Sequence, residues 1–301
     1  SVLARILHMH DRTKEKTEES TGETEKIEST TQEDTMPKQV RSKGGISAWE
    51  RVLLSRKTDR PVGTDYVNML FSDFMEYHGD RLFRDDPAVA GGIAMFGNIP
   101  VTVIAQVKGK TTKENVTRNF AMMSPEGYRK TLRLIRQAEK FGRPVICIVD
   151  TPGAFCGQEA EEHGQGEAIA SNLYELSSIK VPVLIGEGGS GGALALAVAD
   201  EVWILENSVY SVLSPEGFAS ILWKDSKRAS EAAEVMKLTA DDLKCLGIVE
   251  QVIREPKSYT SQTMAGVCEE LKNMLSVFLK KYGSMDERQL LNHRYDRFRK
   301  M

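Results

Sequence analysis

The sequence predicts an α/β fold whose sheet is covered by helices, and two patterns carry this prediction. Short apolar strands alternate with helical segments between residues 91 and 215, and a glycine-rich stretch at 186–192 joins one strand to an alanine-rich helix. Apolar strands that recur between helices are typical of sheets buried on both faces. The 301 residues allow one domain of about 200 to 250 residues with extensions.

Helix-start and turn signals place the individual elements. Ser47-Ala-Trp-Glu50 is a capping box, which predicts a helix from there to about Ser55. Gly97-Asn98 separates two apolar runs, 91–96 and 100–108, and predicts a β-hairpin. The other predicted elements are helices over 66–77, 125–141, 159–177 and 193–198 and from 215 onward, and strands over 145–149, 181–185, 202–205 and 209–213.

The two ends of the chain are predicted to be extensions of this domain. Residues 11–45 contain three apolar side chains, which are too few to offset the entropy of ordering. We therefore predict a disordered or loosely helical tether over 1–45, a folded domain over 46–256 and a C-terminal helical extension over 257–301.

The composition is that of an ordinary globular protein. The net charge of −3 gives no reason to expect a nucleic-acid partner, and no apolar run approaches the ~20 residues of a membrane helix. The opening residues 2–9 are too short for a secretory signal. Four widely spaced cysteines without a Cys-x-x-Cys pair predict no metal site and no disulfide framework, and favour a cytoplasmic location.

The glycine-rich stretch is the most informative feature for function. Five of the seven residues 186–192 are glycines, so backbone N–H groups are exposed at the start of a helix whose N-terminus carries partial positive charge. Such a turn suits an anion or an oxyanion. The other loops that follow predicted strands and open helices are 108–120, 150–157 and 211–217, and we expect all four to meet at the carboxyl ends of the strands.

The glycines and the nearby loops have three other interpretations. Gly188-Gly-Ser-Gly-Gly192 fits the nucleophile elbow of hydrolases, with Ser190 as nucleophile, but His293 is the single histidine downstream. Gly109-Lys-Thr111 ends like a phosphate-binding loop, yet Ile104 stands where its first glycine belongs. The third interpretation is structural: the glycines simply let a helix pack closely on the sheet.

Five motifs in collinear order resemble the α-subunit family of bacterial-type acetyl-CoA carboxylase carboxyltransferases. The resemblance covers roughly residues 48–256. The motifs are Lys108-Gly-Lys-Thr-Thr-Lys-Glu-Asn115 with Arg118-Asn-Phe120, Asp150-Thr-Pro-Gly-Ala-Phe155, Glu161-Glu-His-Gly-Gln-Gly-Glu-Ala168, Gly186-Glu-Gly-Gly-Ser-Gly-Gly-Ala-Leu194 and Tyr210-Ser-Val-Leu-Ser-Pro-Glu-Gly217.

The resemblance implies a crotonase-like fold, a spiral of ββα units, and a carboxyltransferase of α₂β₂ composition. It implies transfer of a carboxyl group from carboxybiotin, carried on the biotin carboxyl carrier protein, to acetyl-CoA, giving malonyl-CoA for fatty acid synthesis. Biotin carboxylase would be a further member of the complex. The zinc of the family belongs to the β subunit, so no metal is expected here. A hydratase or isomerase acting on acyl-CoA, and a non-catalytic assembly subunit, are the alternative functions.

The resemblance also implies the site residues. Gly191, Gly192 and Ala193 match the backbone oxyanion stretch, and no side-chain general base is predicted. Lys108, Lys110, Lys113 and Arg118 form a basic loop, which could hold a carboxylate or the phosphates of CoA. A charged loop that is simply exposed to solvent explains these four residues equally well. Ser214-Pro-Glu-Gly217 either positions a ligand or caps the next helix, and capping is favoured. Asp150 is expected to orient the loop after it. The predicted substrate-binding residues are Lys108, Lys110, Lys113, Arg118, Gly188, Gly189, Ser214, Glu216 and Gly217.

Overall fold

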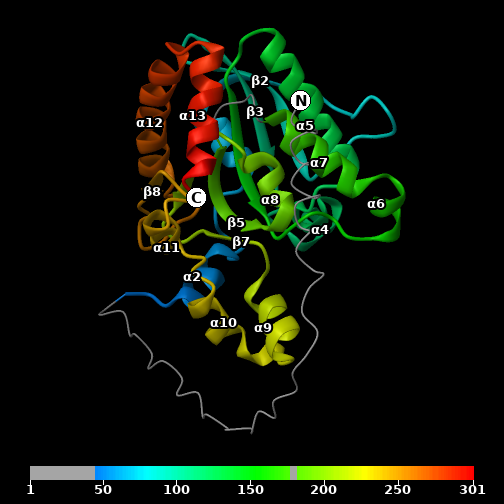
Figure 1. Ribbon diagram of the computed structural model, residues 1–301, viewed down its shortest axis with the longest axis vertical. Coiled ribbons are helices and arrows are strands. Elements are labelled where there is room, and N and C mark those ends of the chain that lie inside the picture. The colour runs from blue at the N-terminus through cyan, green and yellow to red at the C-terminus, as the bar shows by residue number, and fades with distance from the viewer. Residues whose placement is uncertain (1–44, 177–181) are drawn as a thin grey trace, which may run out of the picture. The chain divides into compact units, whose positions relative to one another are not determined.

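One mixed sheet organises the part of the chain described here, residues 45–176 and 182–301 of a computed structural model (Figure 1). The predicted tether therefore lies, apart from residue 45, outside the described residues. The sheet runs in the order β1-β2-β3-β4-β5-β6-β8, and β7 pairs separately with β5. The strands are β1 (Ser72–Glu76), β2 (Val89–Phe96), β3 (Ile99–Gln106), β4 (Val145–Thr151), β5 (Pro182–Gly189), β6 (Trp203–Leu205), β7 (Val209–Ser211) and β8 (Gln251–Ile253).

The sheet combines an antiparallel edge with a parallel centre. β1, β2 and β3 pair antiparallel, and the predicted hairpin is confirmed, with Phe96 opposite Ile99 and Gly97 in the left-handed region at φ 58°. From β3 through β4, β5 and β6 to β8 every pairing is parallel, as is β5 with β7. The carboxyl ends of these strands therefore lie at one edge of the sheet.

Helices cover both faces of the sheet, as predicted. Side chains that alternate along β3 and β4 separate into two clusters: Val103 and Ile148 pack with α3 and α12, while Ile104 and Cys147 pack with α5, α7 and α8. Figure 1 shows α12 and α13 on one side of the strands and α5 and α7 on the other. The helices are α2 (Ala48–Ser55), α3 (Gly63–Leu70), α4 (Thr112–Thr117), α5 (Pro125–Lys140), α6 (Gln158–Glu162), α7 (Gln165–Glu175), α8 (Ser190–Ala197), α9 (Pro215–Trp223), α10 (Ala229–Val235), α11 (Ala240–Cys245), α12 (Ala265–Gly283) and α13 (Glu287–Arg299).

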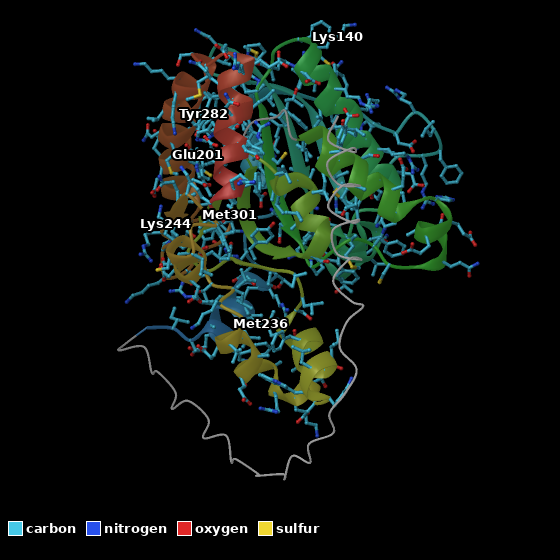
Figure 2. The ribbon with its side chains drawn as sticks, in the orientation of Figure 1. Lys140, Glu201, Met236, Lys244, Tyr282 and Met301 are labelled. Carbon is cyan, nitrogen blue, oxygen red and sulfur yellow. The ribbon has the colours of Figure 1, made fainter. Side chains whose placement is uncertain are left out.

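Helix α12 is held on the sheet by a partly buried polar contact. Glu201, just before β6, accepts hydrogen bonds from the Tyr282 hydroxyl (2.9 Å) and from Trp203 Nε1 (2.8 Å). Figure 2 shows Tyr282 and Glu201 near each other on the side of α12 and α13. The Lys281 ammonium lies 3.0 Å from the same carboxylate, so α12 is tied to the sheet by charge as well as by apolar packing.

Two predicted helices are wrong in extent. The segment 66–77 ends its helix at Leu70, and Ser72–Glu76 form the edge strand β1, because pairing with β2 outweighs the local helical pattern. The predicted helix 159–177 divides at Gly164, whose φ of 80° is left-handed and separates α6 from α7. Ser177 lies outside the described residues. The helices predicted to start at Ser47, Pro125 and Pro215 are confirmed, the first with its capping box.

A left-handed turn follows α4. Asn119, Phe120 and Ala121 have φ of 46°, 55° and 61°, a conformation that costs L-residues roughly 1–2 kcal/mol each. No sequence signal predicts it, since phenylalanine and alanine do not favour this region. The chain after the turn is anchored at Met123, which is fully buried and whose carbonyl accepts from the Gln165 amide (2.9 Å) and the Phe155 N–H (3.0 Å).

Candidate active site

The glycine-rich turn is shorter than the sequence predicts. β5 continues to Gly189, and α8 begins at Ser190, so residues 186–189 belong to the strand. Glycines can form a strand here because the hydrogen bonds between strands involve backbone atoms alone. Gly188 pairs with Thr151 of β4 and with Tyr210 of β7. Val149 of β4 pairs with Leu184 of β5, and the next paired residues are Thr151 and Gly188. More residues of β5 than of β4 lie between these two pairs, so β5 has a β-bulge shortly before α8.

The first turn of α8 offers backbone donors at its open end. The first N–H groups of a helix have no partner inside the helix, and they carry its partial positive charge. Gly191 and Gly192 occupy this turn. Ala193 is the first residue whose N–H can reach back to the carbonyl of Gly189, so the helix competes for this donor. Of the three predicted oxyanion donors, Gly191 and Gly192 are the better placed.

The glycines of the turn differ in how closely other residues pack against them. A Cβ on Gly189 would lie 2.0 Å from the Pro152 carbonyl oxygen, and one on Gly192 would lie 2.5 Å from the Ala154 nitrogen. These two positions require glycine so that α8 can pack on the loop after β4, which supports the structural interpretation for them. A Cβ on Gly191 would meet nothing closer than Ile169 Cγ2, at 3.7 Å. Gly191 therefore leaves space through which a flat ligand could approach the backbone.

Ser190 combines an exposed position with a strained backbone. Its φ of 54° is unusual for serine, and a strained serine at a strand-to-helix turn is also found in hydrolases. The rest of that machinery is missing from the described residues: no histidine there forms a hydrogen bond with the Ser190 hydroxyl. His293 instead lies 3.3 Å from the Tyr282 hydroxyl, and His163 contacts Glu126. The geometry does not support a nucleophilic Ser190.

The first two lysines of the basic loop are held by carboxylates. Lys108 Nζ lies 2.6 Å from Asp150 Oδ1, which joins the ends of β3 and β4. Asp150 thereby orients its loop, in agreement with the role predicted for it. Lys110 Nζ lies 2.7 Å from Asp65 Oδ1 on α3. Burial alone would raise the pKa of Asp65, but the hydrogen bonds from Lys110, the Val62 N–H and Ser261 outweigh this and lower it.

The other two basic residues line a separate hollow. Lys113 and Arg118 belong to the rim of a surface hollow of ≈390 Å³ beside α4, and the Arg118 guanidinium donates to the Pro87 carbonyl (2.7 Å). In the part of the chain that the structure describes, neither residue shares a hydrogen bond or an ion pair with α8. The predicted basic loop therefore divides into two pairs: Lys108 and Lys110 bind carboxylates, whereas Lys113 and Arg118 line the hollow. Of the four, Lys108 alone is seen to contact, through Asp150, the loop that packs on α8 in the described residues.

The Ser214 segment starts α9. The Ser214 hydroxyl accepts from the Gly217 N–H (3.0 Å), which confirms capping. The Glu216 carboxylate forms an ion pair, at 2.7 Å, with Arg56, the residue that follows α2. Partial burial would raise the pKa of Glu216, yet the Arg56 hydrogen bonds lower it. The Gly217 N–H and the Glu216 carboxylate are therefore already engaged within the chain.

We expect Ser214→Ala to lower the free energy of unfolding by about 1 kcal/mol, because the cap of α9 is lost. Ser220→Ala, at an exposed position inside the same helix, is the matched control and should change stability by less than about 0.5 kcal/mol. Urea unfolding measures both. A loss of activity in Ser214→Ala without a loss of stability would instead indicate a direct contact with ligand.

Sequence reasoning missed Gln106. The side chain is fully buried at the end of β3 and contacts the Gly192 carbonyl and the Asp150 N–H. The signal was present, because Gln106 is the one amide in the apolar run 101–107. Buried amides require partners, so a glutamine there indicates a polar network.

The described residues form neither a metal-binding cluster nor a membrane-spanning helix. Within residues 45–176 and 182–301, no group of three or more His, Cys, Asp or Glu side chains is arranged to hold a metal ion. None of the helices described is long and apolar enough to span a bilayer.

Comparison with known proteins gives close relatives along most of the chain. It is 57% identical over 259 residues to the acetyl-coenzyme A carboxylase carboxyl transferase subunit alpha of Clostridium acetobutylicum, covering 85% of this chain and 94% of that protein. A second relative, from Natranaerobius thermophilus, is a fused beta/alpha protein. Identity to it is 54% over 265 residues, which cover 87% of this chain and 44% of the fusion.

Solved structures share the fold at low sequence identity. A transcarboxylase 12S structure, with methylmalonyl-coenzyme A and methylmalonic acid bound, has a TM-score of 0.62 at 18% identity and is matched over 77% of this chain and 43% of that longer one. A Pseudomonas malonate decarboxylase hetero-tetramer in complex with coenzyme A has a TM-score of 0.61 at 16% identity, over 77% of this chain and 91% of that one.

These matches confirm the predicted fold, that of the crotonase-like carboxyltransferases. The sequence also matches one family along almost its whole length, residues 2–301. The chain belongs to the acetyl co-enzyme A carboxylase carboxyltransferase-like family, and its close relatives are alpha subunits.

Proposed function

We propose that this chain is the α subunit of an acetyl-CoA carboxylase carboxyltransferase. In this function it moves a carboxyl group from carboxybiotin to acetyl-CoA and forms malonyl-CoA, the committed precursor of fatty acids. The observation that carries the proposal is the open first turn of α8, where Gly191 leaves a path to backbone N–H groups while Gly189 and Gly192 fix the turn on its neighbours. Family membership supports the same reaction.

The residues of the turn fit a flat, carbonyl-bearing ring such as that of biotin. Carboxybiotin supplies the carboxyl group when its carrier protein is bound. The Gly191 and Gly192 N–H groups would donate to a ring oxygen as negative charge develops there, a role worth roughly 10²- to 10³-fold per donor in enzymes that use it. We assign Ala193 a secondary share and no side chain the role of general base. Gly188 acts as strand backbone rather than as a ligand contact.

The partners follow from the same proposal. We infer an α₂β₂ assembly whose β subunit carries the zinc and completes the acetyl-CoA side of the site, and the fused beta/alpha relative supports this pairing. The biotin carboxyl carrier protein delivers the carboxyl group, which biotin carboxylase has loaded at the expense of ATP. A cytoplasmic location is consistent with the thiols of Cys147, Cys156, Cys245 and Cys268, which are unpaired in the structure.

The reverse reaction tests the proposal directly. The chain is combined with its β subunit, and malonyl-CoA is supplied with or without biocytin as acceptor. We expect acetyl-CoA to form only when biocytin is present. Hydration of crotonyl-CoA without biocytin would support the hydratase alternative. Biocytin-dependent turnover that is unchanged by substitutions in the first turn of α8 would support a non-catalytic assembly subunit.

A further inference from the structure

Gln106 is a buried amide whose donors and acceptor are all engaged. Its Nε2 lies 3.3 Å from Met123 Sδ and 3.4 Å from the Gly192 carbonyl oxygen, and its Oε1 accepts from the Asp150 N–H at 3.1 Å. The side chain has no exposed surface. The contact with Gly192 is at the long end of hydrogen bonding, while the one with Asp150 has ordinary length.

The contact with Gly192 acts on the proposed oxyanion turn. The carbonyl of Gly192 and the N–H of Ala193 belong to one planar peptide unit, so a donor that holds the carbonyl also fixes the direction of that N–H. A hydrogen bond accepted by the carbonyl polarises the unit and strengthens its donor. Because the C=O and the N–H of a trans peptide point in opposite directions, Gln106 lies on the side of this unit away from the Ala193 N–H.

The contact with Asp150 acts on the surface against which the turn packs. Gly192 lies against the backbone of Gly153 and Ala154, in the loop that leaves β4 just after Asp150. The same amide thus holds both the helix turn and the start of the loop beneath it. This support matters because glycines enter a helix at a cost in conformational entropy, and the first turn of α8 contains two of them.

We propose that Gln106 is a positioning residue. Its buried amide holds the Gly192–Ala193 peptide unit, and because this unit shares the α carbon of Gly192 with the unit that carries the Gly192 N–H, it also restrains that better-placed donor. The inference rests on the proposed function, since it assigns Gln106 a role in that site. A purely structural role, in which Gln106 only satisfies buried groups, is the alternative that the experiment must separate.

Three variants separate these roles. Gln106→Glu keeps the shape and an acceptor for the Asp150 N–H, but once its carboxyl is ionised it has no donor for the Gly192 carbonyl. Burial raises the pKa of a carboxyl at this position, so this variant is assayed at pH values on both sides of its pKa. Gln106→Met keeps the size and loses both. The matched control is Thr102→Val, four residues earlier on the same face of β3, which removes the buried hydroxyl that accepts from Arg143 (3.2 Å).

In the complex with the β subunit, we expect both Gln106 variants to lower kcat at least about tenfold, less than the 10²- to 10³-fold typical of a deleted oxyanion donor. KM for malonyl-CoA and for biocytin should stay within about twofold, because the donors matter most in the transition state. The deficit of Gln106→Glu relative to the unmodified protein should shrink as the pH falls, because a protonated carboxyl regains an O–H donor. Thr102→Val should lose stability without these changes.

A second measurement needs no turnover. Hydrogen exchange in the peptide covering residues 189–195, in the absence of substrate, should quicken in both Gln106 variants and not in Thr102→Val. Where Gln106→Met fails to fold, the isosteric Gln106→Glu carries the comparison. Unchanged exchange together with a kcat equal to that of Thr102→Val would overturn the positioning role. If the unmodified complex transfers no carboxyl group, the proposed function is wrong. The hydrogen-exchange result still shows whether the Gln106 amide holds the first turn of α8.

Discussion

Purified without any β subunit, this chain is expected to fold but to transfer no carboxyl group, and adding the β subunit should produce biocytin-dependent turnover of malonyl-CoA. The reason is the composition of the site. The open turn of α8 supplies backbone donors for one reactant, and in the proposed function the β subunit completes the acetyl-CoA side of the site. The relative in which both subunits form one polypeptide supports the same division of labour.

Three controls make this result interpretable. Circular dichroism of the isolated chain should show a cooperative thermal transition, so that inactivity is not unfolding. Mass spectrometry of the preparation excludes host β subunit, and a heat-denatured β subunit should restore nothing. Robust biocytin-dependent turnover by the pure chain alone would contradict the shared site. Hydration of crotonyl-CoA by the pure chain would instead support the acyl-CoA hydratase or isomerase alternative.

Those parts of the fold that depend on local chemistry could be predicted from the sequence. The capping box at Ser47 and the proline at the start of α5 act within one turn of helix, so neighbouring residues suffice to predict them. The hairpin at Gly97 and the buried strand β4 follow from patterns that repeat over a few residues. Each of these was found where it was predicted.

The secondary-structure predictions that are wrong concern segments whose structure depends on residues far away in the sequence. Ser72–Glu76 have a helix-like pattern but gain backbone hydrogen bonds by lying beside β2, which is a partner that local periodicity does not reveal. The glycines at 186–189 look like a loop, yet β4 and β7 flank them and make them strand. The left-handed turn at Phe120 has no signal of its own and is held by its surroundings.

The candidate site likewise has features that the sequence predicts and features that depend on distant segments. The sequence indicates that the glycine-rich stretch suits an oxyanion, since the residue types alone carry that chemistry. It does not indicate which glycine faces a ligand and which faces the protein. That distinction depends on the Pro152 and Ala154 backbones, which meet Gly189 and Gly192 from the loop after β4. For Gln106 the sequence indicates a buried polar network but not its partners, because the Gly192 carbonyl and the Asp150 N–H belong to other segments.

Gly191 is the position at which the oxyanion proposal can be tested with little structural damage. In the complex with the β subunit we expect Gly191→Val to lower carboxyl transfer by at least about a hundredfold, on the scale of a lost oxyanion donor. The new side chain would fill the space above the turn, where the nearest atom is Ile169 Cγ2 at 3.7 Å from a Cβ. Valine is no poorer than glycine inside a helix, so folding should be preserved.

Two neighbouring substitutions show why this position is preferred and supply the contrast. Gly192→Val would drive its Cβ to 2.5 Å from the Ala154 nitrogen, so a loss of activity there would report displaced backbone rather than a blocked ligand. Ser190→Ala removes an exposed hydroxyl that has no assigned chemistry and should retain activity within about threefold, a change of less than 1 kcal/mol. Size-exclusion chromatography must show normal assembly of each variant with the β subunit. Abolished transfer in Ser190→Ala, together with near-normal transfer in an intact Gly191→Val complex, would replace the backbone oxyanion site with a serine nucleophile.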